Sequence, residues 1–231
     1  QPGAFRKSQN WIGGATLADA VFIPPHHNDL PELMSDFEKF LHNKSQPIPH
    51  LIRIGIAHYQ FETIHPFLDG NGRIGRLLIT LYMVSARLLA RPTLYLSAFF
   101  EKNRLLYYDN LNRVRTHNEL AQWLKFFLEG VRQTAQSSIE TFRAIISLRQ
   151  EIEHRAILTL GKKSKLAQQF LQDLYSKPIT DSQETAQRLS INPSTALRLI
   201  EDFIRLGILK EITGYKRNRV FVFERYLKLF E

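Results

Sequence analysis

The chain has 231 residues, no cysteine and a formal net charge of +9. The absence of cysteine excludes a disulfide framework and a thiolate metal site, and no apolar run approaches the ~20 residues that span a bilayer. A hydrophobic fraction of 44% supports one large or two modest packed domains. The positive charge favours acidic partners, with ATP and nucleic acid as candidates, although a solvated basic surface explains it equally well.

The first forty residues change from an irregular segment to a helix. Residues 3–14 show little helical periodicity. Gly13-Gly14 could turn a hairpin whose return strand is Val21-Phe22-Ile23. An ordinary surface hairpin is one interpretation, and a hairpin with its own function is the other. From Asp29 to Leu41 apolar residues recur at helical spacing, which predicts a helix there.

Further helices are predicted before residue 161. One that looks buried on most sides spans residues 50–64 and should end at His65, because Pro66 disfavours the helical region for the residue before it. The next starts after the Gly70-Asn71-Gly72 turn and runs to about Leu89. Apolar periodicity also predicts a helix at residues 101–115 and one or two long helices at residues 120–160.

One stretch between two of these helices concentrates chemistry-bearing residues: Ile64-His65-Pro66-Phe67-Leu68-Asp69-Gly70-Asn71-Gly72-Arg73-Ile74-Gly75-Arg76. A glycine-rich turn that opens a helix points free N–H groups and a positive dipole end at an anion, phosphate above all. Arg73 and Arg76 share one face of the first helical turns and suit phosphate oxygens. Asp69 beside phosphate makes sense if Mg²⁺ bridges them, and His65 can take a proton near neutral pH.

Together these residues form a set suited to phosphoryl or nucleotidyl transfer. Each residue alone has a simpler structural interpretation. A Gly-Asn-Gly turn is often only a turn, and a lone histidine is more often a satisfied surface or core residue. The ordered set as a whole favours the chemical interpretation.

Residues 65–76 resemble the signature of the Fic (filamentation induced by cAMP) family, His-x-Phe-x-(Asp/Glu)-Gly-Asn-Gly-Arg-x-x-Arg, at every defined position. Fic proteins mostly transfer AMP from ATP to a hydroxyl side chain of a target protein. The resemblance implies that His65 deprotonates a Ser, Thr or Tyr hydroxyl and that Phe67 is a core anchor. It also implies that Asp69 holds Mg²⁺ against the phosphates of ATP, while pyrophosphate leaves.

The resemblance assigns the nucleotide to a further set of residues: Asp69, Gly70, Asn71, Gly72, Arg73, Arg76, Tyr107 and Tyr108. The Gly-Asn-Gly turn would form the anion hole, and Arg73 would steady the β/γ end of the nucleotide. The two tyrosines resemble the pair that flanks the adenine in this family. Tyr108 is the preferred one, since tyrosine can both stack and hydrogen-bond, and two core-facing tyrosines are the alternative.

The segment from Gly13 to Ile23 resembles the Fic flap, a hairpin that holds the target's backbone beside the active site by strand addition. The flap normally follows several helices, so we expect that an N-terminal part of the domain is missing. Many Fic proteins also carry an inhibitory helix with a (Ser/Thr)-x-x-x-Glu-(Gly/Asn) pattern, whose Glu pairs with the second motif arginine, here Arg76. Residues 1–231 hold no such pattern. The helix could lie upstream, come from another chain or not exist.

Beyond a predicted linker at residues 161–165, the sequence changes character. Helices are predicted at residues 166–175, 181–189 and 193–204, with Thr180 or Asp181 and then Asn192 as caps. Two strands follow, at residues 210–213 and 219–223. Three helices and a two-stranded wing resemble a winged helix-turn-helix module, which commonly follows the Fic core in one bacterial subgroup.

This C-terminal region carries 13 Lys and Arg against 8 Asp and Glu from residue 162 onward. Its wing holds Lys216, Arg217 and Arg219, which suit phosphate contact. Glu201 and Asp202 on the presumed recognition helix would repel phosphate. DNA binding and docking to protein both stay open.

The sequence therefore predicts a mainly α-helical fold: a Fic-type core with a β-hairpin flap at residues 1–161 and a winged helix-turn-helix domain at residues 162–231. The predicted function is a Mg²⁺-dependent protein adenylyltransferase that uses ATP and modifies either itself or a target docked near Gly13–Ile23. The alternatives are a DNA-binding transcriptional regulator with a nucleotide-sensing core, and a Fic relative that transfers a phosphoryl group or removes AMP. We expect a bacterial, cytoplasmic protein with no membrane partner, and a homodimer stays open.

Overall fold

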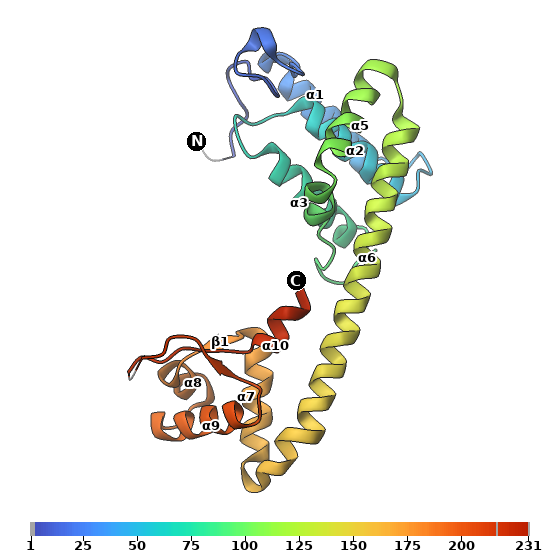
Figure 1. Ribbon diagram of the computed structural model, residues 1–231. Coiled ribbons are helices and arrows are strands. Elements are labelled where there is room, and N and C mark those ends of the chain that lie inside the picture. Colours follow the sequence, from blue (N-terminus) through green and yellow to red (C-terminus); the bar gives the residue numbers. More distant parts are fainter. Residues whose placement is uncertain (1–2, 216, 231) are drawn as a thin grey trace. The chain divides into compact units, whose positions relative to one another are not determined.

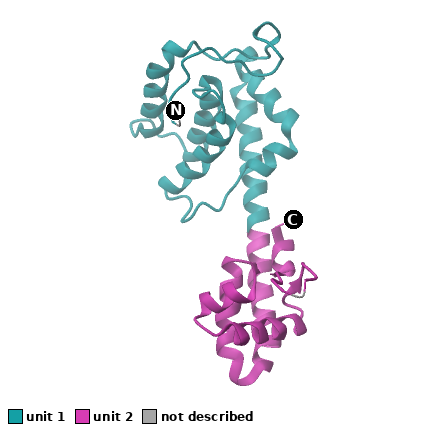
Figure 2. Ribbon diagram, turned by 90° about the vertical axis from the view of Figure 1, so that its left-hand side faces the viewer, with its two compact units in different colours: residues 1–138 teal, residues 139–231 magenta. Residues whose placement is uncertain are grey.

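The structure is a computed structural model that describes residues 3–215 and 217–230. It is mainly helical and divides into two compact units, residues 1–138 and 139–231 (Figure 2). The boundary lies inside the long helix α6 (Leu120–Glu151). In the described ranges, no helix combines the length and the apolar character that a membrane crossing requires.

Unit 1 begins with an irregular segment that contains two short 3-10 turns, η1 (Leu17–Asp19) and η2 (His27–Asp29). Its helices are α1 (Leu30–His42), α2 (His50–Ile64), α3 (Asn71–Ser85), α4 (Ser97–Lys102), α5 (Arg104–His117) and the first part of α6 (Figure 1). The predicted positions of α1 and α2 are confirmed. Helix α3 ends at Ser85 rather than near Leu89, because the chain turns at Arg87 with a φ of 58°. The helix predicted at residues 101–115 begins only after a break at Asn103.

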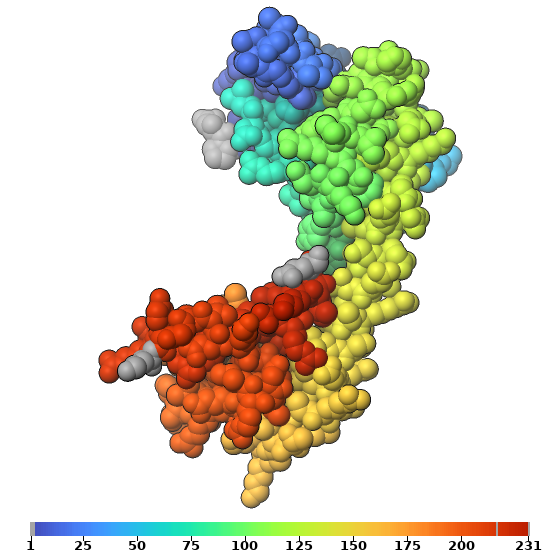
Figure 3. All heavy atoms as spheres, in the orientation of Figure 1, coloured from blue at the N-terminus to red at the C-terminus, as the bar shows by residue number. Residues whose placement is uncertain are grey.

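The hairpin predicted in the N-terminal segment is not confirmed. Ile12 and Phe22 form an isolated antiparallel bridge, in which the Ile12 N–H donates to the Phe22 carbonyl at 2.9 Å. The loop between them is closed by Asp19, whose carboxylate accepts from the N–H groups of Ala15 and Thr16 at 2.8 and 2.6 Å. Local bonds from a side chain to the backbone thus replace a strand ladder. This segment, blue in Figure 3, lies on the outside of unit 1.

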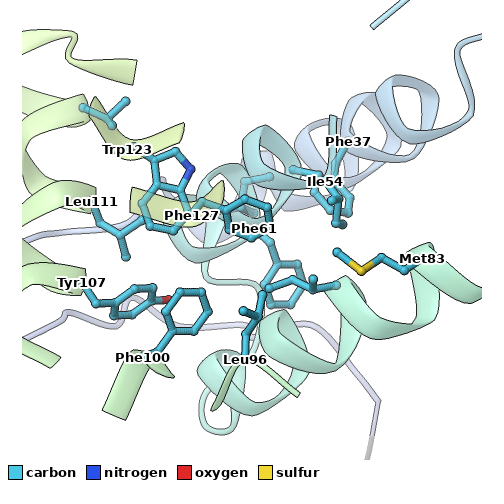
Figure 4. Packing of buried hydrophobic residues seen from close by; sticks show 14 of the residues in the cluster. Phe37, Ile54, Phe61, Met83, Leu96, Phe100, Tyr107, Leu111, Trp123 and Phe127 are labelled. Carbon is cyan, nitrogen blue, oxygen red and sulfur yellow. The ribbon is translucent and has the colours of Figure 1, made fainter. Parts of the chain in front are cut away.

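The core of unit 1 is built around α2, which is buried on most sides as predicted. Ile54 and Phe61 of this helix pack among apolar side chains of α3, α5 and α6 (Figure 4). Trp123 of α6 is 0% exposed, and its Nε1–H donates to the carbonyl of Gly55 on α2 at 2.9 Å. This packing holds α2, the helix that leads into the motif, in the core.

Unit 2 continues from α6 through a π-helical turn, η3 (Ile152–Ala156), and a 3-10 segment, η4 (Ile157–Lys163), into α7 (Ser164–Ser176), α8 (Ser182–Leu189), α9 (Pro193–Arg205), α10 (Glu224–Leu227) and η5 (Lys228–Phe230). A three-stranded antiparallel sheet with the order β1-β3-β2 consists of β1 (Ile179–Thr180), β2 (Lys210–Glu211) and β3 (Phe221–Val222). Strand β1 was not predicted, because two residues leave no alternation to detect. The carboxylate of Asp181 accepts from the N–H groups of Gln183 and Glu184, which confirms it as the cap of α8.

The segment predicted as a linker is a kink between helical elements, with Gly161 at φ 55° and ψ −120°. Leu148 and Ile157, which precede it, are buried in the same cluster as Phe170 and Phe203 of unit 2. The units therefore divide at residues 138 and 139, whereas the sequence prediction put the boundary at 161 and 162.

Candidate active site

His65 lies in a turn that the local sequence dictates. Helix α2 ends at Ile64 because Pro66 follows, and His65 takes the left-handed conformation, with φ 50° and ψ 59°. Its N–H still donates to the Phe61 carbonyl at 2.9 Å. Such a backbone is uncommon for a residue other than glycine, so other contacts have to hold it.

The environment of the His65 imidazole favours its neutral form. Burial lowers the pKa of His65 from its ordinary 6.5. A contact of the ring with the Glu62 backbone opposes this, and the positive charges of Arg6 and Arg115 lower the pKa further. Its Nδ1 is buried and has no hydrogen-bond partner among the described residues. This leaves Nε2 as the nitrogen that an incoming group can reach. A neutral imidazole can accept a proton at neutral pH.

The turn between α2 and α3 is braced by Asn71, the first residue of α3. Asn71 is 2% exposed, and its side chain binds both backbone groups of Phe67, the N–H and the carbonyl. The Phe67 N–H donates to Asn71 Oδ1 at 2.9 Å, and Asn71 Nδ2 donates to the Phe67 carbonyl at 2.7 Å. The side chain of Asn71 is therefore committed to the turn, and only its backbone N–H is left for an anion.

Replacing Asn71 with alanine should destabilise unit 1 by about 2–3 kcal/mol, because two hydrogen bonds disappear and the polar groups of Phe67 lose their partner. Chemical denaturation measures this loss. The matched control is Asn110→Ala on α5, where an equally enclosed side chain (5% exposed) makes one bond, to the carbonyl of Leu106 in its own helix. An equal loss in the two variants would contradict the bracing role.

The N-terminus of α3 offers backbone N–H groups to an anion. Gly70 is the residue before the helix, with a φ of 83°, and no side chain caps it. A positive φ is natural for glycine. The first N–H groups of a helix, here those of Asn71, Gly72 and Arg73, have no partner within the helix, and the helix dipole is positive at this end. The arrangement is a ready-made phosphate site.

Charged side chains surround this helix start. Arg73 and Asp69 form a weak pair, with Nη2 and Oδ2 3.5 Å apart and side chains 77% and 94% exposed. An exposed pair of this kind contributes little to stability, so both groups are available to a ligand. Arg73 and Arg76 line one cavity of about 220 Å³, as their shared helix face predicts. The other residues of its lining are Leu77, Thr80, Tyr95, Leu96 and Ser97.

The two tyrosines predicted near the adenine differ in exposure. Tyr107 is 4% exposed, and its hydroxyl lies 2.9 Å from Nε2 of His58. Nδ1 of His58 donates to the Gly75 carbonyl at 3.0 Å, so the neutral ring accepts the proton of the Tyr107 hydroxyl. Tyr108 is 47% exposed and is the member of the pair that a ligand can reach. His58 is 0% exposed.

Glu62 is a candidate that sequence reasoning missed. It is 6% exposed, and its Oε1 is buried without a partner among the described residues. Burial raises its pKa from 4.5 to about 7, against the opposing charges of Arg76 and Arg115. A Cβ at Gly75 would lie 2.4 Å from this Oε1, so glycine at that position makes room for the carboxyl group. An acidic residue three positions before His65, in a helix predicted to be buried on most sides, was the available signal.

Comparison with known proteins places similarity on the part of the chain that holds this site. Residues 1–83, which include His65 through Arg76, match the Fic/DOC family. The protein adenylyltransferase Fic of Aedes aegypti is 32% identical over 133 residues, which are 57% of this chain and 24% of that protein. The protein of the same name from Culex quinquefasciatus is 33% identical over 133 residues, again 57% of this chain and 24% of that protein. The chain thus spans about a quarter of the length of these curated relatives.

The fold extends the likeness beyond the matched segment. A Fic family protein from Desulfovibrio desulfuricans G20 covers 96% of this chain with a TM-score of 0.54 and 21% sequence identity. The chain covers 62% of that protein. At this level of identity the likeness concerns the fold.

Proposed function

We propose that this chain is a protein adenylyltransferase of the Fic family, which moves AMP from ATP to a Ser, Thr or Tyr hydroxyl of a target protein or of itself. One observation carries the proposal. A histidine whose environment favours the neutral imidazole lies six positions before an uncapped helix N-terminus that bears two arginines on its first turns. Two relatives, each named protein adenylyltransferase Fic, support the same reaction.

The residues divide the chemistry between them. His65 accepts the proton of the target hydroxyl as its oxygen attacks the α-phosphorus of ATP. The bond from that phosphorus to the bridging oxygen of the β-phosphate breaks, and pyrophosphate leaves with the electron pair. The backbone N–H groups at the start of α3, together with Arg73 and Arg76, hold the phosphate oxygens. Catalysis is then mainly positioning and charge stabilisation.

Asp69 is the residue that would hold Mg²⁺. Its carboxylate is 94% exposed and offers hard oxygen ligands beside the proposed phosphate site. The described residues contain no cluster of three or more His, Cys, Asp or Glu side chains that could hold a metal by themselves. The chemistry of Asp69 therefore fits an ion that takes its remaining ligands from ATP and water. When bound, Mg²⁺ neutralises charge on the phosphates.

Target docking is assigned to the loop at residues 13–23, although the ordered hairpin is absent from it. Leu17, Val21 and Ile23 are 45%, 64% and 50% exposed, so the loop presents apolar side chains to a partner. The loop is tied to α5 by Arg115, whose guanidinium carbon lies 3.7 Å from the ring centroid of Phe22. Main-chain groups beyond the Ile12–Phe22 bridge can pair with an extended peptide.

Unit 2 we assign to the winged helix-turn-helix class, on the order α7-β1-α8-α9-β2-β3 and the antiparallel sheet. The alternative of a DNA-binding regulator loses support from one contact. Arg219, expected to meet phosphate, pairs with Glu211 at 2.6 Å. Lys216 lies outside the described residues, and Glu201 is exposed on α9. A protein partner suits this surface better than DNA.

Intact-mass analysis after incubation with ATP and Mg²⁺, with and without a bacterial lysate, tests the proposed reaction. A gain of one AMP on the chain or on a lysate protein, absent with His65→Ala, is the expected result. A gain of one phosphate would show that the chain transfers a phosphoryl group instead of AMP. Binding of ATP without any mass gain in either sample would favour the nucleotide-sensing regulator.

A further inference from the structure

An N-terminal strap, residues 5–10, contacts the first part of the turn that carries His65, at residues 64–67. The backbone N–H of Arg6 donates to the Pro66 carbonyl at 2.9 Å. Asn10 Nδ2 donates to the Phe67 carbonyl at 3.1 Å, and the ring centroid of Phe5 lies 5.8 Å from that of Phe67. The strap is far from the turn in sequence, so these contacts are tertiary.

The side chain of Arg6 reaches further into the turn. It is 3% exposed, and its Nε donates to the His65 carbonyl at 3.0 Å. Its Nη2 donates to the Ile64 carbonyl at 3.4 Å. With the backbone bond to Pro66, Arg6 binds the carbonyls of three consecutive residues, and His65 is the central one.

The physical need for such a residue is clear from α2. The last carbonyls of a helix lack intrahelical partners, and the helix dipole places negative charge there. A guanidinium satisfies both the hydrogen bonds and the charge. The left-handed backbone of His65 is an uncommon one for a residue other than glycine. The hydrogen bonds from Arg6 to the carbonyls of Ile64 and His65 hold it in place.

We propose that Arg6 is a positioning residue for His65, and that it couples the base to the proposed target-docking loop. The proposal rests on the proposed function for its kinetic consequence. The coupling follows from two more bonds of the same guanidinium, to the carbonyls of Ser8 and Pro25. Ser8 and Pro25 lie before and after the docking loop at residues 13–23, so one side chain ties the segments that flank this loop to the backbone of the base.

Kinetics of Arg6→Met and Arg6→Lys test the positioning role. A displaced base slows the chemical step, so kcat should fall about 10–100-fold in Arg6→Met. The KM for ATP should change less than about twofold, since Arg6 does not contact the proposed nucleotide site. Arg6→Lys keeps the charge but replaces the planar guanidinium fork with one ammonium group, and it should recover part of kcat.

Two controls separate positioning from stability. Arg53→Met removes another buried arginine (4% exposed), which donates to the carbonyls of Phe40 and Gln46, away from the motif. Gln9→Ala removes a strap side chain that bonds to Pro24 and not to the turn. Both should keep kcat. An equal loss of kcat in Arg53→Met and Arg6→Met would overturn the proposal.

An NMR measurement tests whether Arg6 positions His65, and it does not depend on enzymatic activity. The ring signals of His65, assigned by their loss in His65→Gln, should shift and broaden in folded Arg6→Met and stay in place in Arg53→Met. If the wild-type chain transfers no AMP, the proposed function fails while this readout still tests the contact. Unchanged His65 signals in folded Arg6→Met, or in Arg6→Lys where the Met variant does not fold, would overturn the inference.

Discussion

Replacing His65 with alanine should abolish AMP transfer and leave ATP affinity nearly unchanged. Loss of a general base costs about 10²–10⁴-fold in rate, whereas the nucleotide is held by the N-terminus of α3 and by the motif arginines. Arg76→Ala should instead weaken ATP binding, because it removes a cation from the phosphate site. Calorimetric titration with ATP and a mass-based transfer assay measure the two effects separately.

His50→Ala supplies the matched control for the histidine change. His50 lies at the start of the same helix, where its Nδ1 is 2.8 Å from the Tyr82 hydroxyl, and this variant should keep activity. The lowered pKa of His65 adds a second expectation. The apparent pKa of the acid limb in the pH profile of kcat/KM should lie below the ordinary histidine value of about 6.5. Loss of ATP affinity in His65→Ala would show that the residue binds rather than deprotonates.

Replacing Glu62 with glutamine should change how the stability of unit 1 depends on pH. The pKa of Glu62 is raised from 4.5 to about 7 in the folded chain, so the folded state holds this proton more tightly than the unfolded state. The resulting stabilisation is full below about pH 4.5 and is lost as the pH rises through about 7. The shift corresponds to about 3 kcal/mol.

The comparison is made between pH 5 and pH 8 by chemical denaturation. Relative to wild type, Glu62→Gln should gain about 2–3 kcal/mol in unfolding free energy over this interval, because glutamine has no proton to release. Glu38→Gln, at an exposed position on α1, is the matched control for the change of charge. The same pH dependence in wild type and Glu62→Gln would contradict a buried, proton-retaining carboxyl group.

The pH dependence of His58 is the reason for comparing Glu62→Gln with the wild-type chain instead of reading the wild-type curve alone. Burial lowers its pKa from 6.5 to about 4, so its contribution to stability is full above about pH 6.5 and is lost as the pH falls toward 4. The slopes from His58 and Glu62 have opposite signs between about pH 4.5 and 6.5. The wild-type curve is therefore flatter than either group alone would make it, and subtraction of the two curves isolates Glu62.

The sequence by itself determined the local geometry of the site. Pro66 ends α2 at His65 through a steric clash with its neighbour, and Gly70 starts α3 through its tolerance of positive φ. The three-residue spacing of Arg73 and Arg76 puts both on one face of α3. These are properties of a few adjacent residues, so they can be read without knowing the fold.

Only the tertiary structure decided which distant groups meet that turn. Arg6 reaches the carbonyl of His65 across 59 positions of sequence. The burial of Glu62 depends on the approach of α3 at Gly75. The same holds for Tyr107, whose hydroxyl is committed to His58 in the core. Periodicity reports which face of a helix is apolar, but the partner of a buried polar atom is set by how the helices pack.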